Sequence, residues 1–182
     1  SDERTRKVHS SGDMIRVVDL YKSFGNQKVL KGVTMEFTKG KITTIVGTSG
    51  CGKTVLLKHL NALLLPDRGQ VLVDSVDITT LKQKELYEIR GRFGVLFQGA
   101  ALLDSMTVFD NVAFPLREKT KMSQTEIQKK VEERLDHVGL EGMGYKYPAE
   151  LSGGMRKRAG LARALVIDPE IVLFDEPTTG LD

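Results

Sequence analysis

One stretch of eight residues decides how this sequence folds: Gly47-Thr48-Ser49-Gly50-Cys51-Gly52-Lys53-Thr54. It fits the pattern G-x-x-x-x-G-K-[ST], in which glycines let consecutive backbone N–H groups curl around a phosphate. The lysine of the pattern reaches the terminal phosphate oxygens, and the hydroxyl group at its last position holds Mg²⁺. The sequence therefore predicts a phosphate-binding loop in which Lys53 and Thr54 contact the ligand.

The segments on both sides of this loop have the character that such a loop requires. Residues 41–46 are mostly β-branched and predict a buried strand, and the leucine-rich run 55–64 predicts a helix that ends before Pro66. A phosphate in the loop would then meet the start of a helix, whose N–H groups and dipole favour an anion. Because strand, loop and helix coincide, an accidental glycine-rich turn is the weaker explanation.

Cys51 is the one cysteine of the chain, and it lies inside this loop. A thiol beside a helix N-terminus is more reactive than an ordinary one, so we expect alkylation of Cys51 to block nucleotide binding. A small residue that simply fits the loop is sufficient to explain its presence. A single cysteine also excludes an intrachain disulfide and is typical of a reducing compartment.

The bulk composition limits the classes of function. A chain of 182 residues can hold one substantial core. Its net charge of +3 comes from interleaved acids and bases, so nucleic-acid binding is not expected. The densest basic cluster, residues 156–158, is either a solvated helix face or an anion-binding group. The apolar runs are too short to cross a bilayer, so another chain would have to span any membrane involved.

The pattern along the chain predicts an antiparallel β region followed by helices. Residues 1–13 are polar and predict a loose tail. Alternating apolar residues predict antiparallel strands from residue 14 to 37 and again from 70 to 78. A short apolar strand is expected at 93–97. Residues from about 99 to 166 turn helical, and we interpret them as a helical subdomain.

Local signals mark one helix of that region in detail. Ser123 and Glu126 are spaced as a capping box, and Gly139 is placed to end the same helix. Glu126 and Lys130 are also spaced as an i,i+4 ion pair.

Two carboxylates, Asp175 and Glu176, follow the apolar strand expected at 171–174. The carboxyl end of such a strand is where α/β sheets bind ligands. We expect Asp175 to hold Mg²⁺, mostly through water, and Glu176 to orient or deprotonate the water that attacks a γ-phosphate. On its own, this pattern would equally fit an acidic turn; the phosphate loop upstream favours the catalytic interpretation.

A second anion cradle is predicted at Leu151-Ser152-Gly153-Gly154-Met155. The hydroxyl of Ser152 and the bare N–H groups of Gly153 and Gly154 would stand at the start of another helix. One chain already has a phosphate cradle in residues 47–54, so the economical explanation is a shared site.

With these motifs in this order, residues 14–182 resemble the nucleotide-binding subunit of ATP-binding-cassette transporters. The resemblance implies an α/β fold of the P-loop NTPase type, with a mixed sheet core, an antiparallel β subdomain and a helical subdomain. It implies ATP and Mg²⁺ as cofactors. It also implies a second ATPase protomer, because the signature of one protomer closes on the γ-phosphate held by the other. The corresponding motifs are Walker A (47–54), the Q-loop glutamine Gln98, the signature (151–155), the Walker B pair Asp175 and Glu176, and the D-loop (179–182). By this resemblance Gln98 is both a catalytic residue, with Lys53 and Glu176, and a ligand of Mg²⁺.

The resemblance also implies an aromatic side chain that stacks on adenine. Phe24 matches that aromatic by its distance before the phosphate loop, and Tyr21 is the second candidate. Either could instead be an ordinary strand residue.

Within this superfamily, residues 99–118 and 151–159 look like the ATPase of Mla/Mce-type lipid transporters, with Met155 where glutamine is commoner. The likeness implies phospholipid or other hydrophobic cargo, a separate integral-membrane permease, and a place on the cytoplasmic face of a membrane or the equivalent face of an organelle. The surface that would receive a coupling helix of the permease, unless its apolar members are subdomain core, comprises Gln98, Ala100, Leu102, Leu103, Met106 and Phe109.

The sequence departs from the family pattern in one main respect. It stops at Asp182, before the switch-loop histidine of the family, so we expect the C-terminal part of the usual domain to be missing and the chain to bind ATP with little turnover. A minor departure is Ser75, where relatives often have glycine.

The alternative functions explain less of the sequence. A soluble cassette ATPase that acts on nucleic acid or ribosomes usually has two cassettes or a long coiled-coil insertion, and about 52 residues between Gln98 and Leu151 leave no room for one. A simple P-loop kinase would not explain residues 151–155. A non-catalytic binding module remains an alternative for the chain as it stands.

Overall fold

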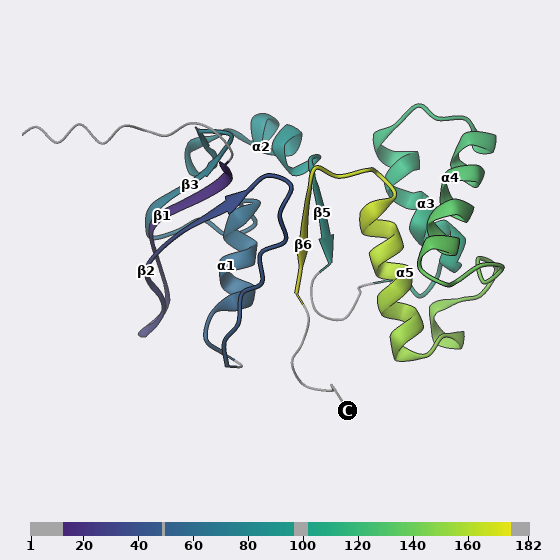
Figure 1. The fold of residues 1–182 in the computed structure, drawn as a ribbon, viewed down its shortest axis with the longest axis horizontal. Coiled ribbons are helices and arrows are strands. Elements are labelled where there is room, and N and C mark those ends of the chain that lie inside the picture. Colours follow the sequence, from purple (N-terminus) through teal and green to yellow (C-terminus); the bar gives the residue numbers. More distant parts are fainter. Residues whose placement is uncertain (1–12, 49, 97–101, 176–182) are drawn as a thin grey trace, which may run out of the picture. The chain divides into compact units, whose positions relative to one another are not determined.

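An antiparallel sheet organises the first half of the chain (Figure 1). The computed structural model describes residues 13–48, 50–96 and 102–175, which fall into two units, 1–86 and 87–182. The sheet of the first unit has the strand order β2-β1-β3-β4. Its strands are β1 (Asp13–Phe24), β2 (Gln27–Thr38), β3 (Arg68–Val73) and β4 (Val76–Asp77).

The alternating pattern of the first strands buries one face of this sheet. Val17 and Leu20 of β1 and Val71 of β3 are fully buried, together with Leu60 of helix α1 (Lys53–Leu60) and Ile78 of the 3₁₀ turn η1 (Ile78–Thr80). Burial of these side chains is the main stabilising contribution to the unit. The antiparallel β region predicted from the sequence is confirmed.

Two predictions about the flanks of the phosphate loop are wrong in this structure. Residues 41–46 do not form a strand, and Ile42 and Val46 are 98% and 88% exposed. Strand propensity requires a neighbouring strand with which to pair, and none pairs with 41–46 in the described part of the chain. The helix after Lys53 ends at Leu60 rather than near Leu64, because Ala62 adopts a left-handed backbone with φ of 56°.

The second unit combines a parallel strand pair with a group of helices. Strand β5 (Phe93–Leu96) pairs in parallel with β6 (Ile171–Phe174), so the predicted apolar strands are both present. Helices α3 (Val108–Lys119), α4 (Gln124–His137) and α5 (Gly153–Leu165) pack around an apolar core (Figure 1). Helix α2 (Gln83–Arg90) spans the division between the units, and the 3₁₀ turn η2 (Pro148–Glu150) precedes α5.

The helix core follows the periodicity of the sequence. Its fully buried members include Val112 of α3, Val131 of α4 and Ala162 of α5. Helix α5 also approaches β5 closely, since a Cβ atom on Gly94 would lie 2.4 Å from the carbonyl oxygen of Ala164. The helices lie inside the range 99–166, and the boundaries of a helical subdomain and of the 1–13 tail stay predictions.

The predicted start of α4 is confirmed in detail. The hydroxyl of Ser123 accepts a hydrogen bond from the backbone N–H of Glu126, and the Glu126 carboxylate accepts from the backbone N–H of Ser123 at 2.7 Å. The predicted Glu126–Lys130 ion pair is wrong. The Glu126 carboxylate is turned back on Ser123, whereas Lys130 and Arg134 both bind the carboxylate of Asp168.

None of the described helices is both long enough and apolar enough to cross a membrane.

Candidate functional site

The phosphate loop ends at a helix start without a side-chain cap. Helix α1 begins at Lys53, and its N-cap residue Gly52 has φ of 97° and no side-chain capping hydrogen bond. Gly50 is also left-handed, with φ of 78°. The N–H groups of the first turn of α1 therefore face the loop rather than a polar side chain, which is the arrangement that binds anions. Ser49 lies outside the described residues.

Two glycines of the loop have close neighbours where a side chain would be. A Cβ atom on Gly47 would lie 2.6 Å from the sulfur of Cys51. A Cβ atom on Gly52 would lie 2.9 Å from a methyl carbon of Val29 and 3.3 Å from its carbonyl oxygen. The loop thus packs against strand β2, and a side chain at Gly52 would require Val29 to shift and the backbone to keep a strained left-handed conformation.

The Lys53 side chain curls back over this loop. Its ammonium donates to the carbonyl oxygen of Gly47, six residues earlier. A cation therefore lies next to the ring of backbone that the motif predicts to surround a phosphate. Cys51 is exposed, as the alkylation hypothesis requires. Thr54, the predicted Mg²⁺ ligand, is the second residue of α1 and is partly buried.

The two candidate aromatics differ in what surrounds them. The guanidinium of Arg68 lies 4.2 Å from the ring centre of Tyr21, and the Tyr21 hydroxyl lies beside Gly32. Phe24 is 46% exposed at the end of β1. Of the two rings, Phe24 has more surface to offer a base, which agrees with the preference from the sequence.

The second cradle is built at the start of α5. Ser152 is the N-cap residue, and its hydroxyl accepts a hydrogen bond from the backbone N–H of Met155 at 3.2 Å. Gly153 and Gly154 are exposed, and a Cβ atom on either would meet no atom within 4 Å. Nothing in the packing of the described residues requires glycine here. Leu151, just before them, is buried and fixes the loop to the helix core.

The basic cluster after this cradle has a structural role that the sequence did not reveal. Arg158 donates to the carbonyl oxygens of Val138 and Gly139, at 3.1 and 3.4 Å. These carbonyls end helix α4, so the guanidinium caps it. Arg156 and Lys157 are exposed.

Asp175 lies where the sequence predicts, directly after β6. Its backbone N–H donates to the carbonyl oxygen of Leu96 at 2.9 Å, which extends the β5–β6 ladder by one bond. Glu176, Gln98 and Ala100 lie outside the described residues, as does the D-loop at 179–182. Of the other residues proposed to receive a coupling helix, Leu103 is exposed, while Leu102 and Phe109 pack against the helix core.

The described site residues therefore form two half-sites. Phe24 and the loop 47–54 belong to the first unit, and the signature and Asp175 belong to the second. No group of three or more histidine, cysteine or acidic side chains is arranged so that it could hold a metal ion in the portion of the chain that the structure describes. The Thr54 hydroxyl of the first unit and the Asp175 carboxylate of the second unit each have the oxygen chemistry that Mg²⁺ prefers.

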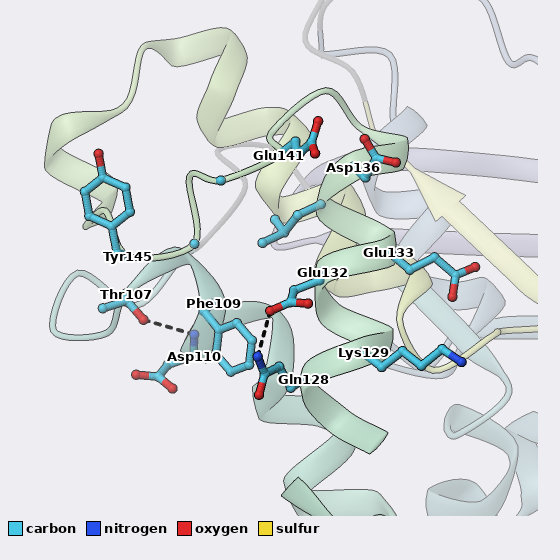
Figure 2. Close-up of a pocket in the computed structure, with 13 residues that line it drawn as sticks. Thr107, Phe109, Asp110, Gln128, Lys129, Glu132, Glu133, Asp136, Glu141 and Tyr145 are labelled. Atoms are coloured by element: carbon cyan, nitrogen blue, oxygen red, sulfur yellow. Dashed lines mark hydrogen bonds between the residues drawn. The ribbon is translucent and has the colours of Figure 1, made fainter. Parts of the chain in front are cut away.

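The sequence analysis missed an acidic hollow on the second unit. The hollow has a volume of about 940 Å³ and is lined by α3, α4 and the loop 141–145 (Figure 2). Phe109 and Leu135 supply apolar lining, and Tyr145 stands at its edge in Figure 2. Its acidic side chains outnumber its single lysine, Lys129, by five to one; they are Asp110, Glu132, Glu133, Asp136 and Glu141. The sequence signal was the placement of acids at 132, 133 and 136 along one helix.

Comparison with known proteins identifies the family. The family model described as "ABC transporter" matches residues 30–179. The chain belongs to the ABC transporter family.

Two curated relatives are similar in sequence to most of this chain. The probable ribonucleotide transport ATP-binding protein Mkl of Mycobacterium leprae is 54% identical over 171 residues, which are 94% of this chain and 49% of Mkl. The intermembrane phospholipid transport system ATP-binding protein MlaF of Haemophilus influenzae is 46% identical over 170 residues, which are 93% of this chain and 64% of MlaF. The chain thus spans about half to two thirds of the length of these relatives.

A solved ABC structure shows the same cassette fold. The ATP-binding cassette MJ0796, in a dimeric post-hydrolysis state bound to ADP and Pi, matches with a TM-score of 0.84 and 34% identity. The match covers 93% of this chain and 76% of that one. The predicted fold class is therefore confirmed.

Proposed function

We propose that this chain is the ATP-binding and ATP-hydrolysing part of an ABC transporter that moves phospholipid or other hydrophobic cargo through a separate membrane permease. One observation carries the proposal. The signature glycines Gly153 and Gly154 are the first two residues of α5, and a side chain would fit at either without any clash. Glycine at these positions makes sense if a group from outside the chain approaches the backbone closely.

In this proposal the outside group is the γ-phosphate held by a second protomer. The N–H groups at the start of α5 and the hydroxyl of Ser152 would donate to it, since a helix start favours an anion. The dimeric state of MJ0796, with its bound ADP and Pi, supports this arrangement.

Each residue of the phosphate site has a proposed role. Lys53 neutralises the phosphate oxygens, and Thr54 and Asp175 hold Mg²⁺ together with Gln98. Bound Mg²⁺ supplies charge neutralisation between the phosphates. Glu176 orients the attacking water or accepts a proton from it. Its role is therefore in ATP hydrolysis rather than in ATP binding. Phe24 stacks on adenine.

An integral-membrane permease is the proposed partner, and this chain is proposed to lie on the cytoplasmic face of that membrane or the equivalent face of an organelle membrane. The acidic hollow of Figure 2 supports this, because it lies beside Phe109, one of the residues predicted to receive a coupling helix. Asp110 is already paired with Arg117 at 2.9 Å, which leaves the carboxylates of α4 to attract a basic segment. We therefore propose a coupling segment with basic side chains around an apolar residue.

The cargo proposal rests on the resemblance of residues 99–118 and 151–159 to Mla/Mce-type ATPases and on MlaF among the relatives. Mkl carries a ribonucleotide name, so nucleotide cargo is the competing assignment.

Isolation of the natural-length protein from gently solubilised membranes tests partner and cargo together. We expect a multi-spanning permease with bound phospholipid. Recovery only with soluble proteins, ribosomes or DNA would overturn the transporter proposal and favour the soluble cassette ATPase. Reversing two charges of the hollow, Glu133→Lys with Asp136→Lys, is expected to release the permease, whereas Glu118→Lys, outside the hollow, is the matched control.

Turnover tests the catalytic assignment. In the assembled complex, Lys53→Ala is expected to lose both ATP binding and hydrolysis, and Glu176→Gln to lose hydrolysis while ATP still binds. Lys31→Ala, on the exposed side of β2, serves as the control. Unchanged hydrolysis in the Glu176→Gln protein would refute its role.

A further inference from the structure

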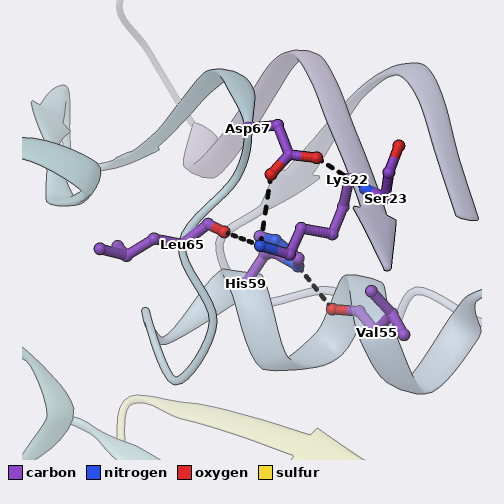
Figure 3. A network of polar contacts seen from close by, with 6 residues as sticks. All are labelled: Lys22, Ser23, Val55, His59, Leu65 and Asp67. Carbon is purple, nitrogen blue, oxygen red and sulfur yellow. Dashed lines mark hydrogen bonds and ion pairs between the residues drawn. The ribbon is translucent and has the colours of Figure 1, made fainter. Parts of the chain in front are cut away.

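The last residues of strand β1, which ends at Phe24, are hydrogen-bonded to the segment after helix α1 (Figure 3). The backbone N–H of Ser23 donates to the Asp67 carboxylate at 2.7 Å, and the backbone N–H of Asp67 donates to the carbonyl oxygen of Tyr21 at 2.9 Å. The ammonium of Lys22 donates to the carbonyl oxygen of Leu65 at 2.9 Å and lies 3.5 Å from the Asp67 carboxylate. Residues 21–23 thus all bind residues 65–67.

Lys22 also contacts Phe24 itself. Its ammonium lies 5.5 Å from the centre of the Phe24 ring, within the range of a cation–π attraction. The Lys22 side chain is only 18% exposed, so its position is set by the groups around it. The same cation therefore binds both the segment after α1 and the ring that is the candidate for adenine stacking.

The strand that pairs with this part of β1 contacts the phosphate loop. Leu30 pairs with Lys22 across the β1–β2 ladder. A Cβ atom on Gly52 of the loop would lie 3.2 Å from a methyl carbon of Leu30. One strand pair thus contacts the phosphate loop through Leu30 and holds Phe24 through Lys22.

A buried histidine, His59, lies beside these contacts (Figure 3). It lies in α1 with 1% of its surface exposed, and its Nδ1 is 2.7 Å from the carbonyl oxygen of Val55. Burial lowers the pKa of His59, and the positive charge of Lys22 lowers it further. The backbone of Leu65 and the negative charge of Asp67 act on the pKa of His59 in the opposite direction, so these two groups face both His59 and Lys22.

We infer that Lys22 and Asp67 are positioning residues for the adenine base. They hold Phe24 at a fixed place relative to the phosphate loop, so that one ATP molecule can reach both. This inference rests on the proposed function, in which ATP is the ligand and Phe24 stacks on its base.

The test compares ATP with tripolyphosphate, which has the phosphates but no base, in titrations of the natural-length protein. Lys22→Met keeps an unbranched apolar side chain and removes the charge. We expect it to weaken ATP binding by about tenfold, the scale of one base–aromatic stack, and to leave tripolyphosphate binding unchanged. Lys22→Arg is expected to restore most of the ATP affinity. Lys31→Met, an exposed lysine of β2, is the control.

A double-mutant cycle separates positioning from general loosening. If Lys22 acts through Phe24, then Lys22→Met causes no further loss of ATP affinity in a Phe24→Ala background. Asp67→Asn provides a second variant in case Lys22→Met does not fold. Equal loss of ATP and tripolyphosphate, additive losses in the cycle, or full ATP affinity in both the Lys22→Met and Asp67→Asn proteins would overturn the inference. Wild-type protein that binds neither ligand would overturn the proposed function instead.

Discussion

The phosphate loop and the signature both place glycines at the start of a helix, yet for different physical reasons. In the loop, Gly47 and Gly52 are surrounded so closely that a side chain would collide with Cys51 or Val29. In the signature, Gly153 and Gly154 have open space where a side chain would be. The first pair of glycines is therefore explained by the chain's own packing, and the second pair is not.

The difference between these two pairs of glycines indicates how the structure of one chain can point to a site shared with another chain. A glycine that the surrounding atoms require carries information about the fold. A glycine that they do not require, at a position where alanine would favour the helix, carries information about something that approaches from outside. Substitutions at the two helix starts should therefore have opposite effects on stability.

The largest effect is expected for Gly52→Ala. Its φ of 97° and the collision with Val29 together should destabilise the protein by about 3 kcal/mol, and ATP binding should be lost with the loop geometry. Urea unfolding and an ATP titration measure the two losses. Gly142→Ala is the control, because Gly142 has φ of 69° but open space around it. It should cost only about 1–2 kcal/mol. Equal costs at both positions would show that packing against β2 is unimportant.

Gly154→Ala should separate stability from turnover. Because alanine fits the site and favours a helix, we expect the free energy of unfolding to rise by about 0.5 kcal/mol. ATP hydrolysis by the assembled complex should fall by at least about tenfold, since the added methyl group obstructs the γ-phosphate of the second protomer. A destabilised protein with normal hydrolysis would contradict the comparison on both counts.

Near pH 6, the pH dependence of stability should come from the loop side of the comparison, because His59 lies in α1. The pKa of His59 is below its usual value when the protein is folded, mainly because of burial. The unfolded chain therefore binds a proton first as the pH falls. Stability from this group is full above about pH 6.5 and declines as the pH drops toward the lowered folded pKa. Thermal melts of wild type and His59→Gln should differ in this window; parallel curves would show that His59 does not contribute.

The smallest effect is expected for Ser75→Gly, which tests a left-handed residue without tight packing. Ser75 has φ of 69° in the turn between β3 and β4. Glycine at this position should raise the free energy of unfolding by about 0.5 kcal/mol. Removal of the backbone strain of serine stabilises the folded protein, and this gain exceeds the loss from the greater freedom of the unfolded chain. A larger gain in urea unfolding would mean that positive φ alone explains the requirement at Gly52.

The parts of the fold that the sequence predicted correctly depend on neighbours in the chain. The capping box of Ser123 and Glu126 and the apolar strand before Asp175 are determined within a few residues. The phosphate loop is likewise recognisable because its glycines and Lys53 act within eight residues.

The predictions that were wrong concern residues whose partners lie far away along the chain. Lys130 binds Asp168, which lies 38 residues away, and no spacing rule could have placed it there instead of on Glu126. Residues 41–46 have the composition of a strand, but composition does not supply a partner strand. The preference for Phe24 over Tyr21 gained its support from Arg68 and Gly32, which are likewise distant.

The close approach of β5 and α5 at Gly94 has a mechanical consequence. Helix α5 has 13 residues and is about 20 Å long, with the signature at one end and Ala164 against Gly94 at the other. The neighbouring bond from Asp175 to Leu96 ties the Walker B strand to β5. Helix α5 therefore connects the signature to the strand pair, and we expect a displacement of the signature to be passed along this helix to the strand that precedes Asp175.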